Sequence, residues 1–244
     1  MRRVTSAVVA AALSLGAIGT VSAQDILREM RSPVAPLTWT GFYAGGNFGY
    51  GWGRDSSSVN ASNGGQSASS FTMKGASAGA QIGMNMQLYG SWMTGIESDF
   101  QKSWQKFDGP NGNLSNLNAA IGFAAPTNER VSIEWFGTTR GRVGYAAGAF
   151  LVYGTGGVAY GQIKTTGGIN GFTQINDTPV KFGWVAGGGV EAMIGRNFSI
   201  RGEYLHMDFG ATTEGYSTAG GITATLHQKI TNDVVRIGLN FFFR

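Results

Sequence analysis

Residues 76–88, ASAGAQIGMNMQL, alternate strictly between apolar side chains and small or polar ones. A period of two is typical of an extended β-strand whose two faces meet different surroundings. The run is about 13 residues long, whereas strands of soluble proteins usually contain about 5–6. A tilted strand needs about 9–11 residues to cross the hydrocarbon layer of a bilayer, so this stretch is long enough to span a membrane.

The same period recurs along the chain and predicts eight long strands. Tight turns near 89–91, 147–148 and 195–197 alternate with long polar segments such as 54–70, which we expect to be irregular. Short turns join antiparallel neighbours, and turns at one end with long loops at the other are typical of bacterial outer-membrane barrels. We therefore expect an all-β fold, an eight-stranded antiparallel up-and-down transmembrane β-barrel with four extracellular loops. The expected strands are 40–53, 76–88, 92–101, 131–145, 150–164, 181–194, 198–209 and 229–243.

The beginning of the chain has the features of a secretory signal peptide. Arg2 and Arg3 form a basic start, a mostly apolar stretch follows, and the small residues 21–23 provide a cleavage signal. The Ser, Thr and Gly residues within the stretch argue against the alternative, a retained transmembrane anchor. We expect a signal peptide at 1–23, a periplasmic leader at 24–38 and a barrel at 39–244, located in the cell outer membrane.

Composition excludes several classes of function. Cysteine is absent, which excludes a disulfide framework and thiol chemistry. Removal of the signal peptide takes away two arginines and no acids, so the formal net charge of +4 falls to about +2, and no basic run indicates nucleic-acid binding. A soluble lipocalin-like barrel or sandwich is the alternative fold. Its outer face would carry many Lys, Glu and Asp, whereas the polar faces here are mostly Gly, Ser, Asn and Gln.

Charged residues on the polar faces of the expected strands point into the barrel. They lie mostly in the turn-proximal half, where unpaired charges would cost several kcal/mol each, so we expect them to form salt bridges. Glu134 is expected to point inward nearer the loop end. The network either plugs the lumen or supports an ion path, and the little room inside eight strands favours the plug. Its members are Glu97, Asp99, Arg140, Arg142, Glu191, Arg201, Glu203 and Arg236.

Candidate ligand-binding and catalytic residues are few. His206 and His227 border the last long segment and could ligate haem or another metal, although we favour ordinary loop or interface roles for both. The segment GTGGVA at 154–159 resembles part of a dinucleotide fingerprint but lacks the helix that such a site requires. No distinctive serine accompanies the histidines in a Ser–His–Asp arrangement, so we expect no enzymatic activity.

Basic residues gather at the loop ends of the expected strands. Lipopolysaccharide phosphates would lie at that level and could bind them, and solvated loop charges are the alternative explanation. These residues are Lys74, Lys102, Lys106, Lys164, Lys181, Lys229, Arg54 and Arg130.

Aromatic residues form two expected bands, as the two membrane interfaces favour. The turn-end band contains Trp39, Phe42, Trp92, Tyr145, Phe150 and Phe198, and the loop-end band contains Tyr50, Trp52, Phe71, Trp104, Phe182 and Trp184.

Several segments in order, among them WTGFYAGGNFGYGWG, WFGTTRGRVGYA, GWVAGGGVEAMI and IRGEYLHMDFG, resemble strands of the small outer-membrane barrel proteins of alphaproteobacteria. That group includes outer-membrane immunogenic proteins and some haem-binding members. The resemblance implies a surface-exposed envelope protein. The narrow expected lumen and its charge pairs favour a structural or surface-interaction role, and a narrow porin or a surface haem-uptake protein is the alternative. No haem motif of the family matches these residues.

The carboxyl end resembles the family's assembly signal, which the barrel-assembly machinery reads. Its alternating apolar residues are Val235, Ile237, Leu239, Phe241 and Phe243.

Arg244 follows the terminal aromatic residue and departs from this pattern. We expect deletion of Arg244 to leave assembly intact or to improve it, because the alternating signal then ends on Phe243. Heat-modifiable migration of the membrane-inserted protein measures assembly, and its loss in the deletion variant would contradict this interpretation of the carboxyl end.

Overall fold

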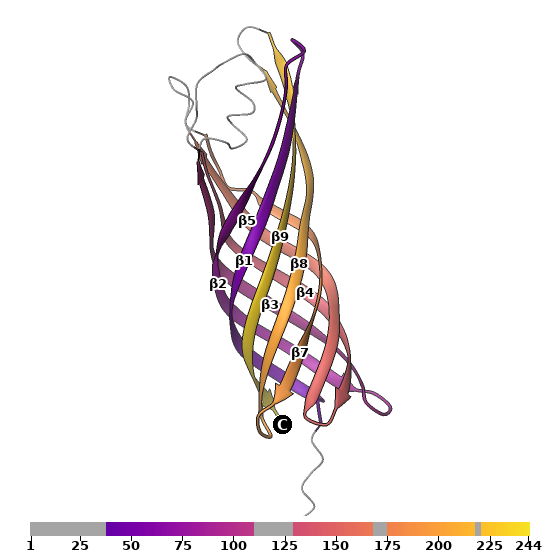
Figure 1. The fold of residues 1–244 in the computed structure, drawn as a ribbon. Helices are drawn as coiled ribbons and strands as arrows, with labels where there is room; N and C mark the ends of the chain where they lie inside the picture. The colour runs from indigo at the N-terminus through magenta and orange to yellow at the C-terminus, as the bar shows by residue number, and fades with distance from the viewer. Residues whose placement is uncertain (1–37, 110–128, 168–174, 218–220) are drawn as a thin grey trace, which may run out of the picture. The chain divides into compact units, whose positions relative to one another are not determined.

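The computed structural model describes residues 38–109, 129–167, 175–217 and 221–244. The expected signal peptide at 1–23 and nearly all of the leader at 24–38 lie outside these residues. The described chain forms the strands β1 (Gly41–Ala61), β2 (Gln66–Gln87), β3 (Trp92–Gly109), β4 (Glu129–Ala147), β5 (Phe150–Gly167), β6 (Ile175–Asp177), β7 (Val180–Met193), β8 (Phe198–Ser217) and β9 (Thr223–Phe243) (Figure 1). Within the described residues, no helix is long and apolar enough to cross a membrane.

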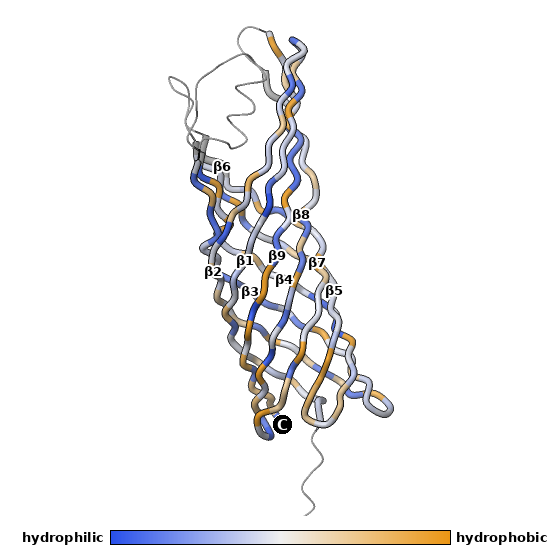
Figure 2. The backbone as a smooth tube through the Cα atoms, viewed as in Figure 1, coloured by the Kyte–Doolittle hydropathy of each residue, from blue (hydrophilic) through white to orange (hydrophobic). Residues whose placement is uncertain are grey.

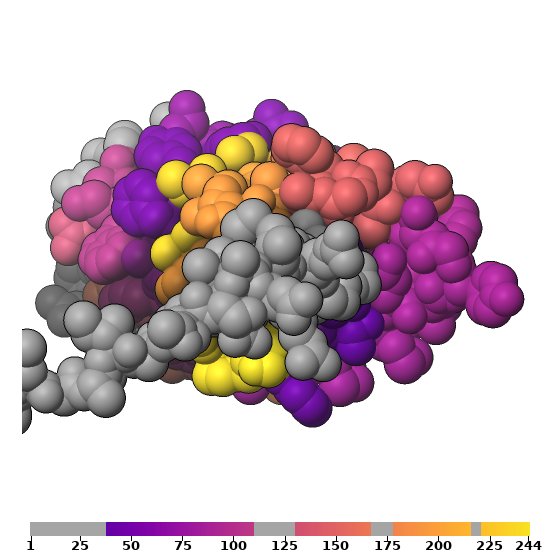
Figure 3. Space-filling view, turned by 90° about the horizontal axis from the view of Figure 1, so that it is seen from below, coloured from indigo at the N-terminus to yellow at the C-terminus, as the bar shows by residue number. Residues whose placement is uncertain are grey.

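Eight long strands close into an antiparallel up-and-down barrel, as the sequence predicts. The sheet order is β4-β3-β2-β1-β9-β8-β7-β5, and pairing of β4 with β5 closes the ring. Strand β6 is a short addition that pairs only with the loop end of β5. At the opposite end of the barrel the turns are tight, and the turn at 88–91 projects from the rim (Figures 1 and 3).

The first and last polar segments between strands are mostly strand, which corrects the expectation of four long loops. Segment 54–70 was expected to be irregular, but β1 continues through it to Ala61 and β2 begins at Gln66. Only a turn at 62–65 separates them, with Gly64 at a φ of 84°. In the same way, β8 and β9 extend to Ser217 and from Thr223. The many Ser and Thr residues of these segments are typical of loops, but here their backbones pair in register with the neighbouring strand.

Large apolar side chains cover the outside of the barrel. Hydrophilic and hydrophobic positions alternate along the strands (Figure 2). Phe42 and Ile82 remain 64% and 65% exposed, as expected of side chains that face acyl chains. Glycines, polar and charged residues, and two clusters of apolar residues face inward instead. This arrangement is the reverse of a soluble barrel. The strand at 76–88 is long because it crosses the hydrocarbon layer, and its two faces differ because one meets lipid and the other the lumen.

The two aromatic bands lie on this outer face, with two exceptions that correct the sequence analysis. Trp39 is fully buried, and its indole N–H donates to the carbonyl of Gly148 at 3.2 Å. Phe71 is also buried and stacks on Phe107, with ring centroids 4.3 Å apart. Trp39 lies before the start of β1, so the alternation of that strand does not determine its direction. Phe71 occupies an inward-facing position of β2.

A β-bulge in β4 changes which residues face the lipid. Uninterrupted alternation would place Val131 and Ile133 on the apolar outer face with Trp135, but both are buried in the interior. The register shifts between Ile133 and Trp135, so the positions on either side of Glu134 follow opposite alternations. Glu134, expected to point inward, lies instead at the surface, where its carboxylate pairs with Lys102 at 3.2 Å.

Glycines on the inner face make room for large side chains from neighbouring strands. Gly83 of β2 pairs with Tyr43 of β1, and a Cβ atom on Gly83 would collide with the phenol ring of Tyr43. Gly202 on the outer face of β8 has open space where its Cβ would lie. The two positions therefore make a matched pair for testing the packing of the lumen.

We expect Gly83→Ala to destabilise the barrel by about 1–3 kcal/mol, because overpacking displaces the Tyr43 ring. Gly202→Ala should leave stability unchanged or raise it slightly, since alanine costs less conformational entropy in a strand than glycine. Denaturant unfolding of both variants in the same detergent measures the difference. Equal midpoints for the two variants would contradict the packing argument.

Candidate functional site

Eight charged side chains meet inside the barrel, and these are the residues that the sequence analysis placed there. They come from β3, β4, β7, β8 and β9, all on inward-facing positions, and each is less than 5% exposed. The strand register sets acid opposite base three times. The pairs are Glu97–Arg140, Glu191–Arg201 and Glu203–Arg236. Opposite charges at directly paired positions stabilise the register of an antiparallel sheet.

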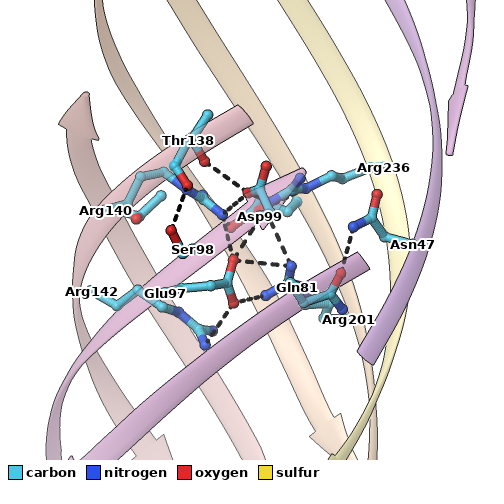
Figure 4. Close-up of polar contacts among 12 residues, drawn as sticks. Asn47, Gln81, Glu97, Ser98, Asp99, Thr138, Arg140, Arg142, Arg201 and Arg236 are labelled. Carbon is cyan, nitrogen blue, oxygen red and sulfur yellow. Dashed lines mark hydrogen bonds and ion pairs between the residues drawn. The ribbon is translucent and has the colours of Figure 1, made fainter. Parts of the chain in front are cut away.

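Glu97 lies at the centre of this network (Figure 4). Its carboxylate forms short ion pairs with Arg140 and Arg201, and the Arg142 and Arg236 guanidinium groups approach to 3.5 Å each. Since β3 and β8 lie on opposite sides of the ring, the Glu97–Arg201 contact crosses the lumen. The network thus ties one wall of the barrel to the other.

The remaining carboxylates hold the outer parts of the network. Asp99 accepts hydrogen bonds from Arg140 at 3.0 Å and from Arg236 at 2.9 Å. Glu203 pairs with the same two arginines, at 3.0 Å and 2.6 Å. Glu191 accepts a hydrogen bond from Arg142 at 2.8 Å. Each carboxylate therefore has a cationic partner, as desolvated charges require.

Two tyrosines complete the network, and the sequence analysis did not single them out. The Tyr43 hydroxyl donates to Glu97 at 2.6 Å and accepts from Arg142 at 2.6 Å. The Tyr153 hydroxyl donates to Glu203 at 3.0 Å, and its ring lies 3.9 Å from the Arg142 guanidinium. The alternation of residues in β1 predicts that Tyr43 points inward. The sequence of β5, which carries Tyr153, does not show which of its faces points inward.

Uncharged amides extend the network to two of the three ring strands that contribute no charge, β1 and β2. Asn47 of β1 donates to Gln81 of β2, which donates to Asn240 of β9 at 2.8 Å. Asn240 in turn donates to Glu191 at 2.8 Å. Together with Tyr153 of β5, these contacts mean that every strand of the barrel ring holds at least one member. We call this set the charge layer.

Apolar layers lie on both sides of the charge layer. The layer toward the turns consists of Trp39, Tyr43, Met93, Ala146, Leu151, Tyr153, Met193 and Phe242. The layer toward the loops consists of Phe71, Met73, Val131, Ile133, Phe136, Ala159, Ile163, Val185, Leu205, Met207, Phe209, Ile230 and Val234. Such surroundings exclude water and strengthen the electrostatic attraction between the charges that they enclose.

The two histidines do not converge on one ligand. His206 pairs in register with Asp233, and its ring nitrogen contacts that carboxylate at 2.8 Å. His227 lies six residues before Asp233 on β9, which separates the two histidines by about 20 Å along the strand. The two histidines therefore do not form one ligand pair for a haem iron or a metal ion, and ligation by either histidine on its own stays a prediction. Among the described residues, no cluster of three potential metal ligands occurs.

The candidate lipopolysaccharide contacts divide into two groups. Lys181 faces inward and donates to Thr212 and Gln228 at 3.2 Å each, which corrects its expected outward position. Lys229 pairs with Asp208 at 3.0 Å and Lys102 with Glu134 at 3.2 Å.

The other candidates lie on the outer surface. Lys74, Lys106 and Lys164 occupy outward positions of β2, β3 and β5. Arg130 pairs with Asp108 at 2.5 Å, and this hydrogen bond raises the pKa of the guanidinium. Arg54 lies on the outward face of β1. The carboxyl-terminal assembly residues also face outward, between 38% and 61% exposed: Val235, Ile237, Leu239, Phe241 and Phe243.

Comparison with known proteins agrees with this architecture. A family model described as an outer membrane protein beta-barrel domain matches residues 9–243. The chain belongs to this outer-membrane β-barrel family. Its location is the bacterial outer membrane, and the soluble alternative is excluded.

The barrel has relatives of similar length among named proteins. The 31 kDa outer-membrane immunogenic protein of Brucella melitensis is 32% identical over 98% of this chain and 99% of its own. The 25 kDa outer-membrane immunogenic protein of Brucella abortus is 28% identical over the full length of both. The 22 kDa outer membrane protein of Rhizobium leguminosarum is 31% identical over 73% of this chain and 68% of its own. Among solved structures, Neisserial surface protein A is 11% identical with a TM-score of 0.41, covering 84% of this chain and 98% of that one.

We expect Arg142→Ala to destabilise this outer-membrane barrel by about 3–5 kcal/mol, because it leaves Glu191 without its cationic partner in the buried layer. Denaturant unfolding in detergent measures the loss. Arg130→Ala is the matched control, since its ion pair is solvated, and its midpoint should stay at the wild-type value. An Arg142→Ala midpoint equal to that of the control would show that the charge layer does not stabilise the barrel.

Proposed function

We propose that this protein is a non-conducting barrel with a structural and surface-interaction role in the cell envelope. The observation that carries the proposal is the charge layer, which crosses the lumen and lies between two apolar layers. An ion entering from either end would have to cross an apolar layer and then displace fully desolvated ion pairs. Both steps are costly, because an unpaired ion loses its hydration without compensation.

The extended β1–β2 and β8–β9 strands support the surface-interaction part of the proposal. Bacterial barrels place short turns in the periplasm and longer connections outside the cell, so the strand extensions project on the outer side. Their paired backbones hold this part of the chain in a defined shape. The relatives in Brucella are named outer-membrane immunogenic proteins, and immunogenicity fits exposure at the cell surface.

Two other functions receive less support. A narrow porin needs a continuous hydrated path, and in the described residues the lumen charges are paired across the barrel. A haem receptor that uses both histidines needs them within ligation distance of one iron, and they lie about 20 Å apart along β9.

Planar-bilayer recording tests the proposal. We expect the folded protein to insert without stable single-channel openings, because the layers of the lumen leave no hydrated path. A porin inserted into the same membrane shows that conductance is detectable, and gel migration before and after heating shows that the barrel is folded. Reproducible openings with a defined conductance would overturn the non-conducting function.

A further inference from the structure

Three lysines form a row across the outer surface of four neighbouring strands. Lys74 of β2 lies directly opposite Lys106 of β3, and both side chains are exposed. Lys106 pairs next with Ser132 of β4, and Ser132 pairs with Lys164 of β5. Neighbouring strands are about 4.8 Å apart, so the row covers about 14 Å of the barrel wall. We call Lys74, Lys106 and Lys164 the lysine row.

The lysine row places Lys74 and Lys106 together with no ion pair to either among the described residues, whereas the charge of Lys164 also acts on the Glu134 carboxylate. Directly opposed like charges destabilise a strand pair, yet here Lys74 and Lys106 face each other. Among the residues that the structure describes, no carboxylate lies within ion-pair distance of any of the three. The nearby acids are already engaged, Glu134 with Lys102 and Asp108 with Arg130. The repulsion would be relieved by an anion from outside the chain.

The height of the row on the barrel indicates where that anion would come from. On β3, Lys106 lies two residues beyond Trp104, an exposed residue of the loop-end aromatic band. On the membrane side of the row, the outward rings of Phe100, Trp135, Tyr160 and Phe182 contact one another in series, with centroids 5.3, 6.4 and 6.4 Å apart. Aromatic rings gather at the boundary between acyl chains and headgroups. The row therefore lies at headgroup level of the outer leaflet.

A hollow in the wall adjoins the lysine row at the β4 bulge. It has a volume of about 440 Å³, and Lys102, Lys106, Trp104, Arg130 and Glu134 contribute to its lining. Trp104 and Ile133 give the hollow its apolar surface, and Lys106 adds a cation, whereas Lys102 and Arg130 are paired with Glu134 and Asp108. This combination suits a ligand with a hydrophobic body and an anionic headgroup. A free anion would use only the cation.

We propose that the lysine row binds the phosphorylated headgroup of an outer-leaflet glycolipid of the lipopolysaccharide class. The three ammonium groups donate hydrogen bonds to phosphoryl oxygens, and the spacing of the row suits a headgroup with more than one phosphoryl group. The bound lipid neutralises the Lys74–Lys106 repulsion and holds β2 to β5 at the membrane surface. This site goes beyond the non-conducting role and does not depend on it.

Thermal unfolding of the refolded barrel in zwitterionic micelles tests the proposal. Bisphosphorylated lipid A and the same lipid after removal of its phosphates are the two probes. We expect the phosphorylated lipid to raise the melting temperature of the wild-type protein and the dephosphorylated lipid to leave it unchanged. In the triple variant Lys74→Gln, Lys106→Gln, Lys164→Gln the rise should disappear, with at least tenfold weaker binding.

The melting temperature without lipid provides a second test, in which loss of a lysine should stabilise the protein instead of weakening its response to lipid. Without lipid, Lys106→Gln should melt at or above the wild-type temperature, because it removes the repulsion from Lys74. Lys229→Gln is the matched control: it removes one exposed charge that is already paired with Asp208, so it should keep the full lipid-induced rise. An equal rise with dephosphorylated lipid or with inorganic phosphate, or a full rise in the triple variant, would overturn the proposal.

Discussion

Lipid offers no hydrogen-bond partner to a polypeptide, so every strand inside the hydrocarbon layer must find its backbone partners on other strands. In this protein the requirement is met by closing eight strands into a ring through the β4–β5 and β1–β9 pairings. Closure then creates an interior that side chains must fill. The outer apolar face, the inner glycines and the buried charge layer are all consequences of that one constraint.

The interior is filled in layers of different character. Apolar clusters lie on both sides of the charged middle layer, and buried polar side chains such as Gln105 and Asn232 lie among the apolar ones on the loop side. A polar middle layer adds directional contacts that fix how the strands face one another, since each guanidinium fits only one arrangement of carboxylates. The ion pair between Glu97 and Arg201 crosses the lumen and connects β3 with β8, two strands that share no backbone hydrogen bond.

Much of this architecture could be predicted from the sequence, because a period of two is a local signal. It identified the strands, the outward direction of side chains such as Phe42 and Ile82, and the inward direction of the eight charged residues. Where the period was interrupted, the prediction failed. Glu134 is the example: one bulge residue reverses the facing of Val131 and Ile133, and nothing in their residue types indicates it. Ser-rich and Thr-rich extensions of β1 and β9 were likewise missed, because composition there indicates a loop.

The sequence by itself determined the compartment, the number of long strands and the lipid-facing side chains where alternation is uninterrupted, because alternation and composition depend only on neighbouring residues. Tertiary structure decided which charges become partners, that Tyr43 and Tyr153 join them, and that the two histidines lie far apart. It also decided that Lys74, Lys106 and Lys164 stand side by side. Those relations depend on strand register and ring closure, which bring together residues that the chain itself separates by tens or hundreds of positions.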